Sequence, residues 1–175
     1  MPDDRELWER IGRGDALAFD ALYRTDAPKL ELFLRQILRS RQAAEDVMQE
    51  TFAQIWRNPN GFDPSRGSLR AYLFGAARKR AAEWWRKHGA AWNRDLKSEP
   101  AEHKAEIASL VGDALARLPE EQQTLMWLRE VEGLSYAELA VILDIPLGTV
   151  RSRLFAAREA LRSVWHAAPA SKEDA

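Results

Sequence analysis

Three arginine side chains near the C-terminal end of the chain have the types and spacing needed to contact DNA. Arg151, Arg153 and Arg158 occur within one short segment, and Ser152 and Phe155 lie among them. Guanidinium groups donate hydrogen bonds to guanine edges and to phosphates, so they serve both sequence readout and positioning on a duplex. The segment therefore predicts binding to double-stranded DNA through hydrogen bonds.

The residues around these arginines follow the pattern of a helix-turn-helix. Ser135 and Glu138 predict a capping box that begins a short helix over 136–143. Asp144-Ile145-Pro146 predicts a tight turn, and a second helix is expected to begin near Leu147. The first helix should bury Leu139, Ala140 and Leu143. In the second helix, the side chains of Val150, Leu154 and Ala157 should point inward. This arrangement places a basic helix where it can enter the major groove, although a helical corner with a few arginines is common.

A second concentration of positive charge lies nearer the middle of the chain. The formal net charge of the whole chain is −1, but residues 61–94 contain eight basic and two acidic side chains. A local cluster of this kind can contact phosphates even when the molecule is nearly neutral. From charge alone, a solvated helix face is an equally good interpretation.

Polar and acidic side chains share one face of the helix expected over 44–57. Asp46, Gln49, Glu50 and Ala53 lie opposite its apolar face. Such a face suits a basic partner, while an ordinary solvated face would have the same composition. The following residues, 58–67, contain two prolines and two glycines and predict a complete break in helical structure. A new helix is expected after them, with Ser68 as its N-cap.

Helical periodicity extends through most of the chain, and no alternating pattern predicts a strand. Residues 89–106 are small, polar and charged, which is typical of a linker. We therefore expect an all-α fold of two small helical domains joined by a flexible linker, the C-terminal one a helix-turn-helix. The expected divisions are an N-terminal domain over 1–90, a linker over 91–106, a C-terminal domain over 107–166 and a disordered tail over 167–175.

Several classes of function are excluded or disfavoured. The chain has no cysteine, which excludes disulfides, thiolate catalysis and Cys-ligated zinc and suits a reducing cytoplasm. His88, His103 and His166 do not share metal-ligand spacing, and no phosphate-binding glycine loop or nucleophile elbow is found. We expect no catalytic residue, no cofactor and no metal. With no signal peptide and no apolar run of about 18 residues, we also expect a cytoplasmic protein without membrane insertion.

Two sets of motifs resemble a known family. Residues 133–140 (GLSYAELA) and 146–161 (PLGTVRSRLFAAREAL) resemble the region of bacterial sigma factors that reads the −35 promoter element. Residues 44–56 (AEDVMQETFAQIW) resemble the polymerase-binding helix of the extracytoplasmic-function (ECF) sigma factors, and 62–73 resemble the approach to their −10 element helix. The resemblance implies a non-enzymatic subunit that directs RNA polymerase to promoters.

The resemblance also implies a role for each group of residues. Core RNA polymerase, through its β′ clamp coiled coil, would bind Asp46, Gln49, Glu50 and Ala53. The melted −10 element would contact Phe62, Asp63, Arg66, Arg78, Lys79, Arg80, Arg86 and Lys87. The double-stranded −35 element would contact Ser135, Thr149, Arg151, Ser152, Arg153, Phe155 and Arg158. The polymerase β flap is a second expected partner, an anti-sigma factor is the expected inhibitor, and the active form would associate with the nucleoid.

Two other functions fit part of the pattern. A stand-alone helix-turn-helix regulator would bind duplex DNA without polymerase, but it gives no role to the polar face of helix 44–57. A decoy that mimics a sigma factor and binds an anti-sigma protein would have no use for the positive charge in 61–94 or for the arginines of 146–162. An enzyme is the least supported alternative. Only the sigma-factor hypothesis uses all three groups of residues.

Overall fold

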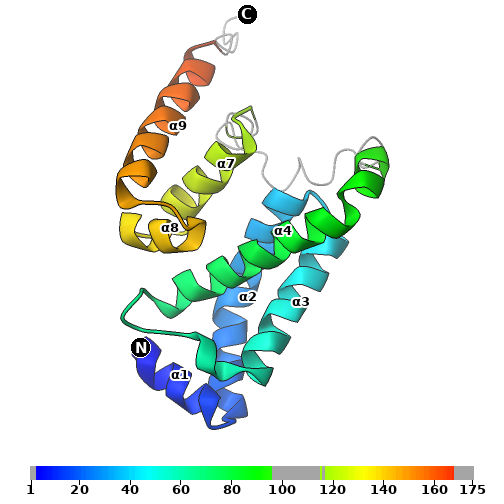
Figure 1. Ribbon diagram of the computed structural model, residues 1–175, viewed down its shortest axis with the longest axis vertical. Helices are drawn as coiled ribbons and strands as arrows, with labels where there is room; N and C mark the ends of the chain where they lie inside the picture. Colours follow the sequence, from blue (N-terminus) through cyan, green and yellow to red (C-terminus); the bar gives the residue numbers. More distant parts are fainter. Residues whose placement is uncertain (1–2, 96–114, 116, 168–175) are drawn as a thin grey trace, which may run out of the picture.

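The computed structural model describes residues 3–95, 115 and 117–167. Every regular element in these residues is a helix, which confirms the expected all-α fold (Figure 1). The α-helices in chain order are α1 (Asp4–Gly12), α2 (Ala16–Leu38), α3 (Arg41–Arg57), α4 (Leu69–Asp95), α7 (Glu120–Met126), α8 (Tyr136–Leu143) and α9 (Leu147–Ala167). The other two are a 3-10 helix, η1 (Pro59–Gly61), and a π-helix, η2 (Trp127–Val131).

Side-chain caps determine where the N-terminal helices begin. The Asp15 carboxylate accepts hydrogen bonds from two amides in the first turn of α2, at 3.0 and 3.1 Å. The Ser40 hydroxyl accepts one from an amide in the first turn of α3 at 3.1 Å. The expected N-cap at Ser68 is confirmed, because its Oγ accepts from the Ala71 N–H at 3.1 Å. Each cap gives a partner to an amide that the helix itself leaves without one.

The N-terminal helices form a small bundle. Helices α2, α3 and α4 pack against one another, and α1 covers one end of α2 (Figure 1). Leu30, Phe33 and Leu34 of α2 are fully buried, as is Phe74 of α4, whose ring centroid lies 5.2 Å from that of Phe33. Helix α3 contributes Phe52 to the same core. This packing holds the polar face of α3 and the basic face of α4 in fixed positions on one bundle.

The C-terminal helices form the expected helix-turn-helix. The capping box at Ser135 is confirmed: its Oγ accepts from the Glu138 N–H at 3.2 Å, and the Glu138 carboxylate accepts from the Ser135 N–H at 2.8 Å. The observed bounds of α8 match the expected helix, and Asp144 ends it with a left-handed φ of 55°. The expected burial was partly wrong. Leu139 and Ile142 are fully buried, Ile142 because α8 packs against α4 as well as α9, whereas Ala140 and Leu143 are only half-buried.

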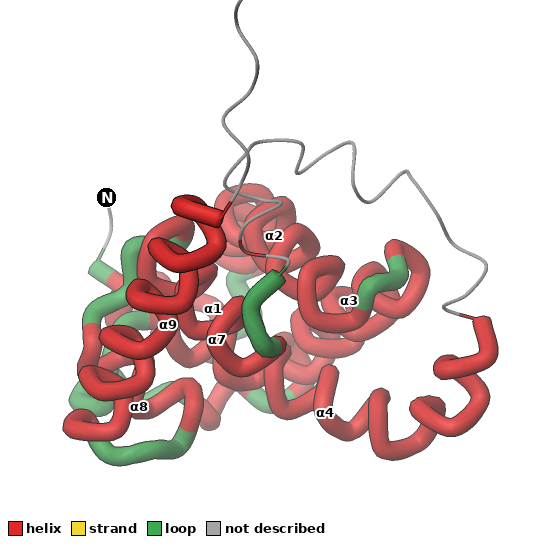
Figure 2. Tube along the Cα trace, turned by 90° about the horizontal axis from the view of Figure 1, so that it is seen from above, coloured by secondary structure: helices red, strands yellow, loops and turns green. Residues whose placement is uncertain are grey.

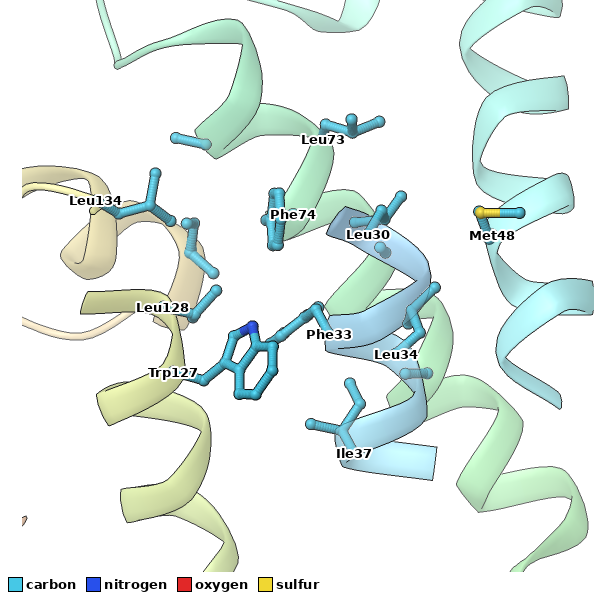
Figure 3. Packing of buried hydrophobic residues seen from close by; sticks show 14 of the residues in the cluster. Leu30, Phe33, Leu34, Ile37, Met48, Leu73, Phe74, Trp127, Leu128 and Leu134 are labelled. Carbon is cyan, nitrogen blue, oxygen red and sulfur yellow. The ribbon is translucent and has the colours of Figure 1, made fainter. Parts of the chain in front are cut away.

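The two regions pack against each other. Trp127, Leu128 and Leu134 of the C-terminal region face Phe33 and Phe74 of the N-terminal bundle (Figure 3). These buried residues belong to one continuous hydrophobic cluster that extends through both regions. Viewed from above, α8 and α9 lie on the opposite side of the molecule from α3 (Figure 2). The described residues therefore adopt a closed arrangement, with α8 seated on the first half of α4.

Helix α4 is longer than expected. It continues to Asp95, so the residues from position 91 to this point are helical although they were expected to begin the linker. The two alanines at 90 and 91 are strong helix formers, which accounts for the extension. The rest of the expected linker and the tail from 168 lie outside the described residues, and the domain boundaries stay a prediction. Among the helices described, none has the length and apolar character to cross a membrane.

Candidate nucleic-acid interface

The first half of α9 presents the expected outer face. Arg151, Ser152, Arg153 and Phe155 are exposed. The residues expected to point inward are fully buried: Val150, Leu154 and Ala157. Phe155 is 68% exposed, so a large apolar ring lies in solvent beside the arginines. Among the described residues Arg151 has no ion-pair partner, which leaves its donors open to a DNA edge or phosphate.

Two arginines of α9 are held by acidic residues of the same region. The guanidinium of Arg153 lies 3.3 Å from the Glu121 carboxylate. Arg158 donates to the Glu130 carboxylate at 2.7 Å and to the Tyr136 hydroxyl at 3.2 Å. Both hydrogen bonds raise the pKa of Arg158, and the bond to Glu130 has the larger effect. Contact of either arginine with DNA would require it to exchange a glutamate for a phosphate or base.

The two expected −35 residues outside this face lie where helices begin. Ser135 is the N-cap of α8, and its hydroxyl is engaged in the capping box. Thr149 lies in the first turn of α9, where its carbonyl oxygen accepts from the Ser152 hydroxyl at 3.1 Å. The first turns of helices carry amides that favour phosphate groups. Both residues are therefore placed where a DNA backbone contact is chemically reasonable.

A cavity of about 570 Å³ lies between the loop at 58–68 and α8. Five of the eight residues expected to handle the −10 element line it: Phe62, Asp63, Arg66, Lys79 and Arg80. The other three, which lie outside this lining, are Arg78, Arg86 and Lys87. The fold therefore gathers residues from the loop and from α4 around one hollow.

Asp63 shapes the loop that borders this cavity. Its carboxylate accepts hydrogen bonds from the Ser65 hydroxyl at 2.7 Å and from the Ser65 N–H at 2.9 Å. These two bonds lower the pKa of Asp63, and the bond from the hydroxyl has the larger effect. The chain then turns through Gly67, whose φ of 151° suits a glycine. The Asp63 carboxylate therefore helps to hold the loop in this conformation.

An aromatic cluster forms part of the cavity wall. Phe62 is only 9% exposed, and its ring centroid lies 5.4 Å from that of Trp8 and 5.7 Å from that of Tyr72. Burial raises the pKa of the half-buried Tyr72. Phe62 is thus anchored in the bundle, and the face it offers to the cavity is small. A base entering the hollow would meet a rigid aromatic edge.

The basic residues of α4 have different environments. Lys79 is exposed at the cavity, whereas Arg80 is half-buried and lies 3.8 Å from the Glu50 carboxylate. Arg78 donates to the backbone carbonyl of Ile142 in α8 at 3.2 Å. The remaining two expected phosphate contacts, Arg86 and Lys87, are exposed further along the helix. Arg78 is therefore engaged by the C-terminal region in this arrangement.

The polar face of α3 points outward as expected. Asp46, Gln49 and Glu50 are exposed, and Ala53 is half-buried. Glu50 lies 3.1 Å from the guanidinium of Arg57. Asp46 and Glu50 also border a smaller cavity of about 220 Å³ beside α4. A basic partner would find two carboxylates here, one of them already paired.

Sequence reasoning missed the polar contacts that join the two regions. The Ser68 hydroxyl donates to the Glu138 carboxylate, and the Gln36 side-chain amide donates to that of Gln123 at 2.9 Å. Glu132 is also buried, at 9% exposure. The partners in these hydrogen bonds lie 70 and 87 positions apart in the chain. No local pattern in a single sequence signals contacts of that separation.

Comparison with known proteins finds relatives along both regions. The family described as Sigma-70 region 2 matches residues 22–91, and that described as Sigma-70, region 4 matches residues 106–161. The ECF RNA polymerase sigma factor RpoE of Cereibacter sphaeroides is 34% identical over 91% of this chain and 95% of its own. The ECF RNA polymerase sigma-E factor of Haemophilus influenzae is 32% identical over 91% and 94%. The RNA polymerase sigma-H factor of Pseudomonas aeruginosa is 33% identical over 90% and 91%.

Two solved structures share the fold. CnrH, in complex with the cytosolic domain of CnrY, aligns with a TM-score of 0.70 at 25% identity, over 94% of this chain and 98% of its own. The sigma factor RpoE of Bartonella quintana, in complex with the anti-sigma factor NepR, aligns with a TM-score of 0.67 at 25% identity, over 86% and 98%. The likeness in each case extends over most of both chains.

Proposed function

The chain belongs to the extracytoplasmic-function (ECF) family of RNA polymerase sigma factors, and from this premise we propose which of its surfaces performs each task. As a member it directs core RNA polymerase to specific promoters and initiates transcription by binding the −35 element and melting the −10 element. The observation that carries the assignment of surfaces is the 570 Å³ cavity, where five of the expected −10 residues meet.

The −10 element is assigned to this cavity and to the basic face of α4. Extruding a base from the duplex costs a few kcal/mol, which contacts to the extruded base can offset. The Phe62 and Tyr72 rings offer an aromatic wall, while Arg66 and Lys79 supply charge at the rim. Arg86 and Lys87 extend the positive charge along α4 for contact with phosphates.

The −35 element is assigned to the exposed face of α9. Arg151 is the side chain best placed to reach a base edge, since no acidic residue of the described chain holds it. Phe155 lies on the same face and can contact an apolar thymine methyl group. Arg153 and Arg158 would contribute once they release Glu121 and Glu130. Ser135 and Thr149 would position the DNA backbone at the two helix starts.

The polar face of α3 is assigned to the β′ clamp coiled coil of core polymerase, and the C-terminal region to the β flap. We assign the first domain to residues before the end of α4 and the second to those after 106, with the linker between them. No residue is assigned a catalytic role, and the protein would act in the bacterial cytoplasm on the nucleoid. An anti-sigma factor is the proposed inhibitor, supported by the complex of the Bartonella quintana relative.

Charge reversal on α3 tests the polymerase assignment. Glu50→Arg should reduce run-off transcription by at least about tenfold with core polymerase on genomic promoter fragments, because close charge pairs at interfaces couple by about 1.5–7 kcal/mol. Glu6→Arg makes the same charge change on an exposed position of α1 and should leave the yield unchanged.

The same experiment separates the alternatives. A stand-alone regulator would bind duplex DNA equally well with Glu50 reversed and would never produce a sigma-dependent transcript. If wild-type protein yields no transcript from any fragment, the sigma-factor function is wrong. If Glu50→Arg transcribes as well as Glu6→Arg, only the assignment of α3 is wrong.

A further inference from the structure

One carboxylate joins the helix-turn-helix to the loop that borders the cavity. Glu138 accepts from the Ser135 N–H through Oε2 at 2.8 Å and from the Ser68 hydroxyl through Oε1. Ser68 is itself the N-cap of α4, since its Oγ accepts from the Ala71 N–H. Burial raises the pKa of Glu138, but the hydrogen bonds from Ser68 and Ser135 outweigh this and lower it overall. A negative charge is therefore held at the start of α4.

We infer that the closed arrangement is self-inhibited: Glu138 of α8 occupies the place of a DNA phosphate at the start of α4, and α8 covers the −10 cavity. The inference rests on the proposed function of that cavity. An ionised carboxylate and a phosphate are both anions that accept a hydrogen bond from a hydroxyl and are favoured at the start of a helix. Single-stranded DNA and α8 then compete for the Ser68 hydroxyl, because the first amide of α4, the Leu69 N–H, already donates to the Asp4 carboxylate at 2.8 Å.

The contacts of α8 support direct competition. Val141, Ile142 and Asp144 form the cavity wall opposite the loop. The Ile142 carbonyl accepts from Arg78, a residue expected to contact −10 phosphates. Asp144 adds the acidic side chain that α8 contributes to the cavity lining, which also includes Lys79 and Arg80 of α4. DNA entering the cavity would have to displace this wall, and to reach the Ser68 hydroxyl it would also have to displace Glu138.

The closed arrangement also cannot span a promoter. The −35 and −10 elements are separated by about 25 base pairs, or roughly 85 Å of B-form DNA at about 3.4 Å per base pair. A compact chain of this length has a radius of gyration of about 16 Å and is roughly 40 Å across. The two regions must therefore separate before both elements are bound. The interface between them is the barrier that polymerase or DNA has to overcome.

Two further contacts hold the regions together away from the cavity. The first is the hydrogen bond that Gln36 donates to Gln123 at 2.9 Å, and neither residue lines the cavity. The second is the apolar contact itself, where the buried rings of Phe33 and Trp127 face each other (Figure 3). These groups allow the interface to be loosened without altering the charge of the DNA-binding surfaces.

A reversible cross-link tests the inference. The chain has no cysteine, and an ideal Cβ at Gly75 would lie 3.8 Å from both Cα and Cγ1 of Ile142, within the reach of a disulfide. The probe is a fluorescent single-stranded DNA of randomised sequence, added to full-length Gly75→Cys/Ile142→Cys protein. Oxidised protein should fail to bind the probe and to support run-off transcription, and reduction should restore both. The reduced form controls for the substitutions themselves.

A substitution that weakens the interface without changing its charge tests the same equilibrium between the closed and the open arrangement. Gln36→Ala removes one interdomain hydrogen bond far from the cavity and should tighten binding of the probe by roughly two- to tenfold. Gln42→Ala, an exposed glutamine of α3, is the matched control and should change nothing. Glu138→Gln should also tighten binding, by about fivefold, because it replaces a charged hydrogen bond with a neutral one.

Each outcome decides the inference. A cysteine pair that does not oxidise shows that the two positions do not meet in solution, which overturns it. Oxidised protein that binds the probe as tightly as reduced protein overturns it too, as does Gln36→Ala that behaves like Gln42→Ala. If reduced and oxidised proteins transcribe equally well, the sigma-factor function stands and only self-inhibition fails. If wild-type protein never transcribes, the proposed function fails whatever the cross-link does to binding of the probe.

Discussion

Tyr72 places its hydroxyl group directly against Gly61, and both residues line the −10 cavity. A Cβ atom at position 61 would overlap that hydroxyl and lie 3.2 Å from Cζ of the same ring. The ring has little room to move, because it packs edge-on against Trp8 at a centroid distance of 5.4 Å. Glycine is therefore required at position 61, because the Tyr72 hydroxyl lies too close for a side chain there.

Gly61→Ala should lower the free energy of unfolding by about 1–3 kcal/mol, the usual cost of overpacking a site that cannot expand. Urea denaturation followed by circular dichroism measures the change. In a Tyr72→Phe background the same substitution should cost less, because the overlapping hydroxyl is gone. Gly148→Ala is the control: its Cβ would meet no atom within 4 Å, and alanine favours the helix. An equal cost of Gly61→Ala in both backgrounds would contradict the proposed contact.

At the scale of the element, the N-caps set the register in which functional faces are presented. Ser40 begins α3, the helix assigned to polymerase, and it is buried at 4% exposure. Its hydroxyl accepts from the Ala43 N–H at 3.1 Å. No hydrogen bond or ion pair described for Asp46, Gln49 or Glu50 involves this cap, so stability and polymerase binding can be separated by mutation.

Ser40→Ala should lower the free energy of unfolding by about 1 kcal/mol, as is typical for loss of a serine cap. The thermal midpoint should fall by roughly 2–8 °C. Ser163→Ala, an exposed serine within α9, should have little effect. Below the transition, the Ser40 variant should bind core polymerase like wild type. If the fully folded Ser40 variant bound core polymerase more weakly than wild type, the cap would also be needed for the polymerase-binding surface.

The elements that local chemistry specifies were predictable from the sequence. Ser135 and Glu138, three positions apart, predicted both the start of α8 and its capping box. The prolines and glycines of 58–67 correctly predicted the end of α3, but the predicted complete break was wrong, because Pro59–Gly61 form the 3-10 helix η1. The outer face of α9 followed from helical periodicity. The length of α4 was underestimated, because its charged and small residues resemble a linker in composition although they favour a helix.

The meeting of the two regions could not be predicted, because nothing local to either element requires it. Ile142 illustrates the reason. As part of a helix-turn-helix it was not expected to be buried, but α4 supplies a second surface on which α8 packs. Glu138 was correctly assigned to its cap, while its second hydrogen bond, to Ser68, depends on the relative placement of two regions. Long-range packing determined these parts of the candidate site.

At the scale of the whole molecule, the interface contains charged groups that respond to pH. Glu132 at the end of η2 is buried against the N-terminal bundle. Burial raises its pKa above the ordinary value of 4.5, although the Trp127 indole and the charges of Arg70 and Lys29 lower it in part. Asp26, which pairs with Arg70 at 3.2 Å, raises it slightly further. The ionised form of Glu132 is therefore disfavoured in the closed, folded protein.

The sign of the resulting pH dependence follows from proton uptake. Between pH 4.5 and the raised pKa, the folded protein holds a proton on Glu132 that the unfolded chain has released. Stability from this residue is therefore lost as the pH rises through that interval, and the loss is complete above the raised pKa. Glu132→Gln, which cannot ionise, should raise the thermal midpoint at pH 8 and leave a smaller change between pH 5 and pH 8. Glu120→Gln, at an exposed position of α7, should follow the wild-type profile. A lower midpoint for Glu132→Gln at pH 8 would mean that attraction to Arg70 and Lys29 exceeds the cost of burial, so that Glu132 secures the closed arrangement rather than weakening it.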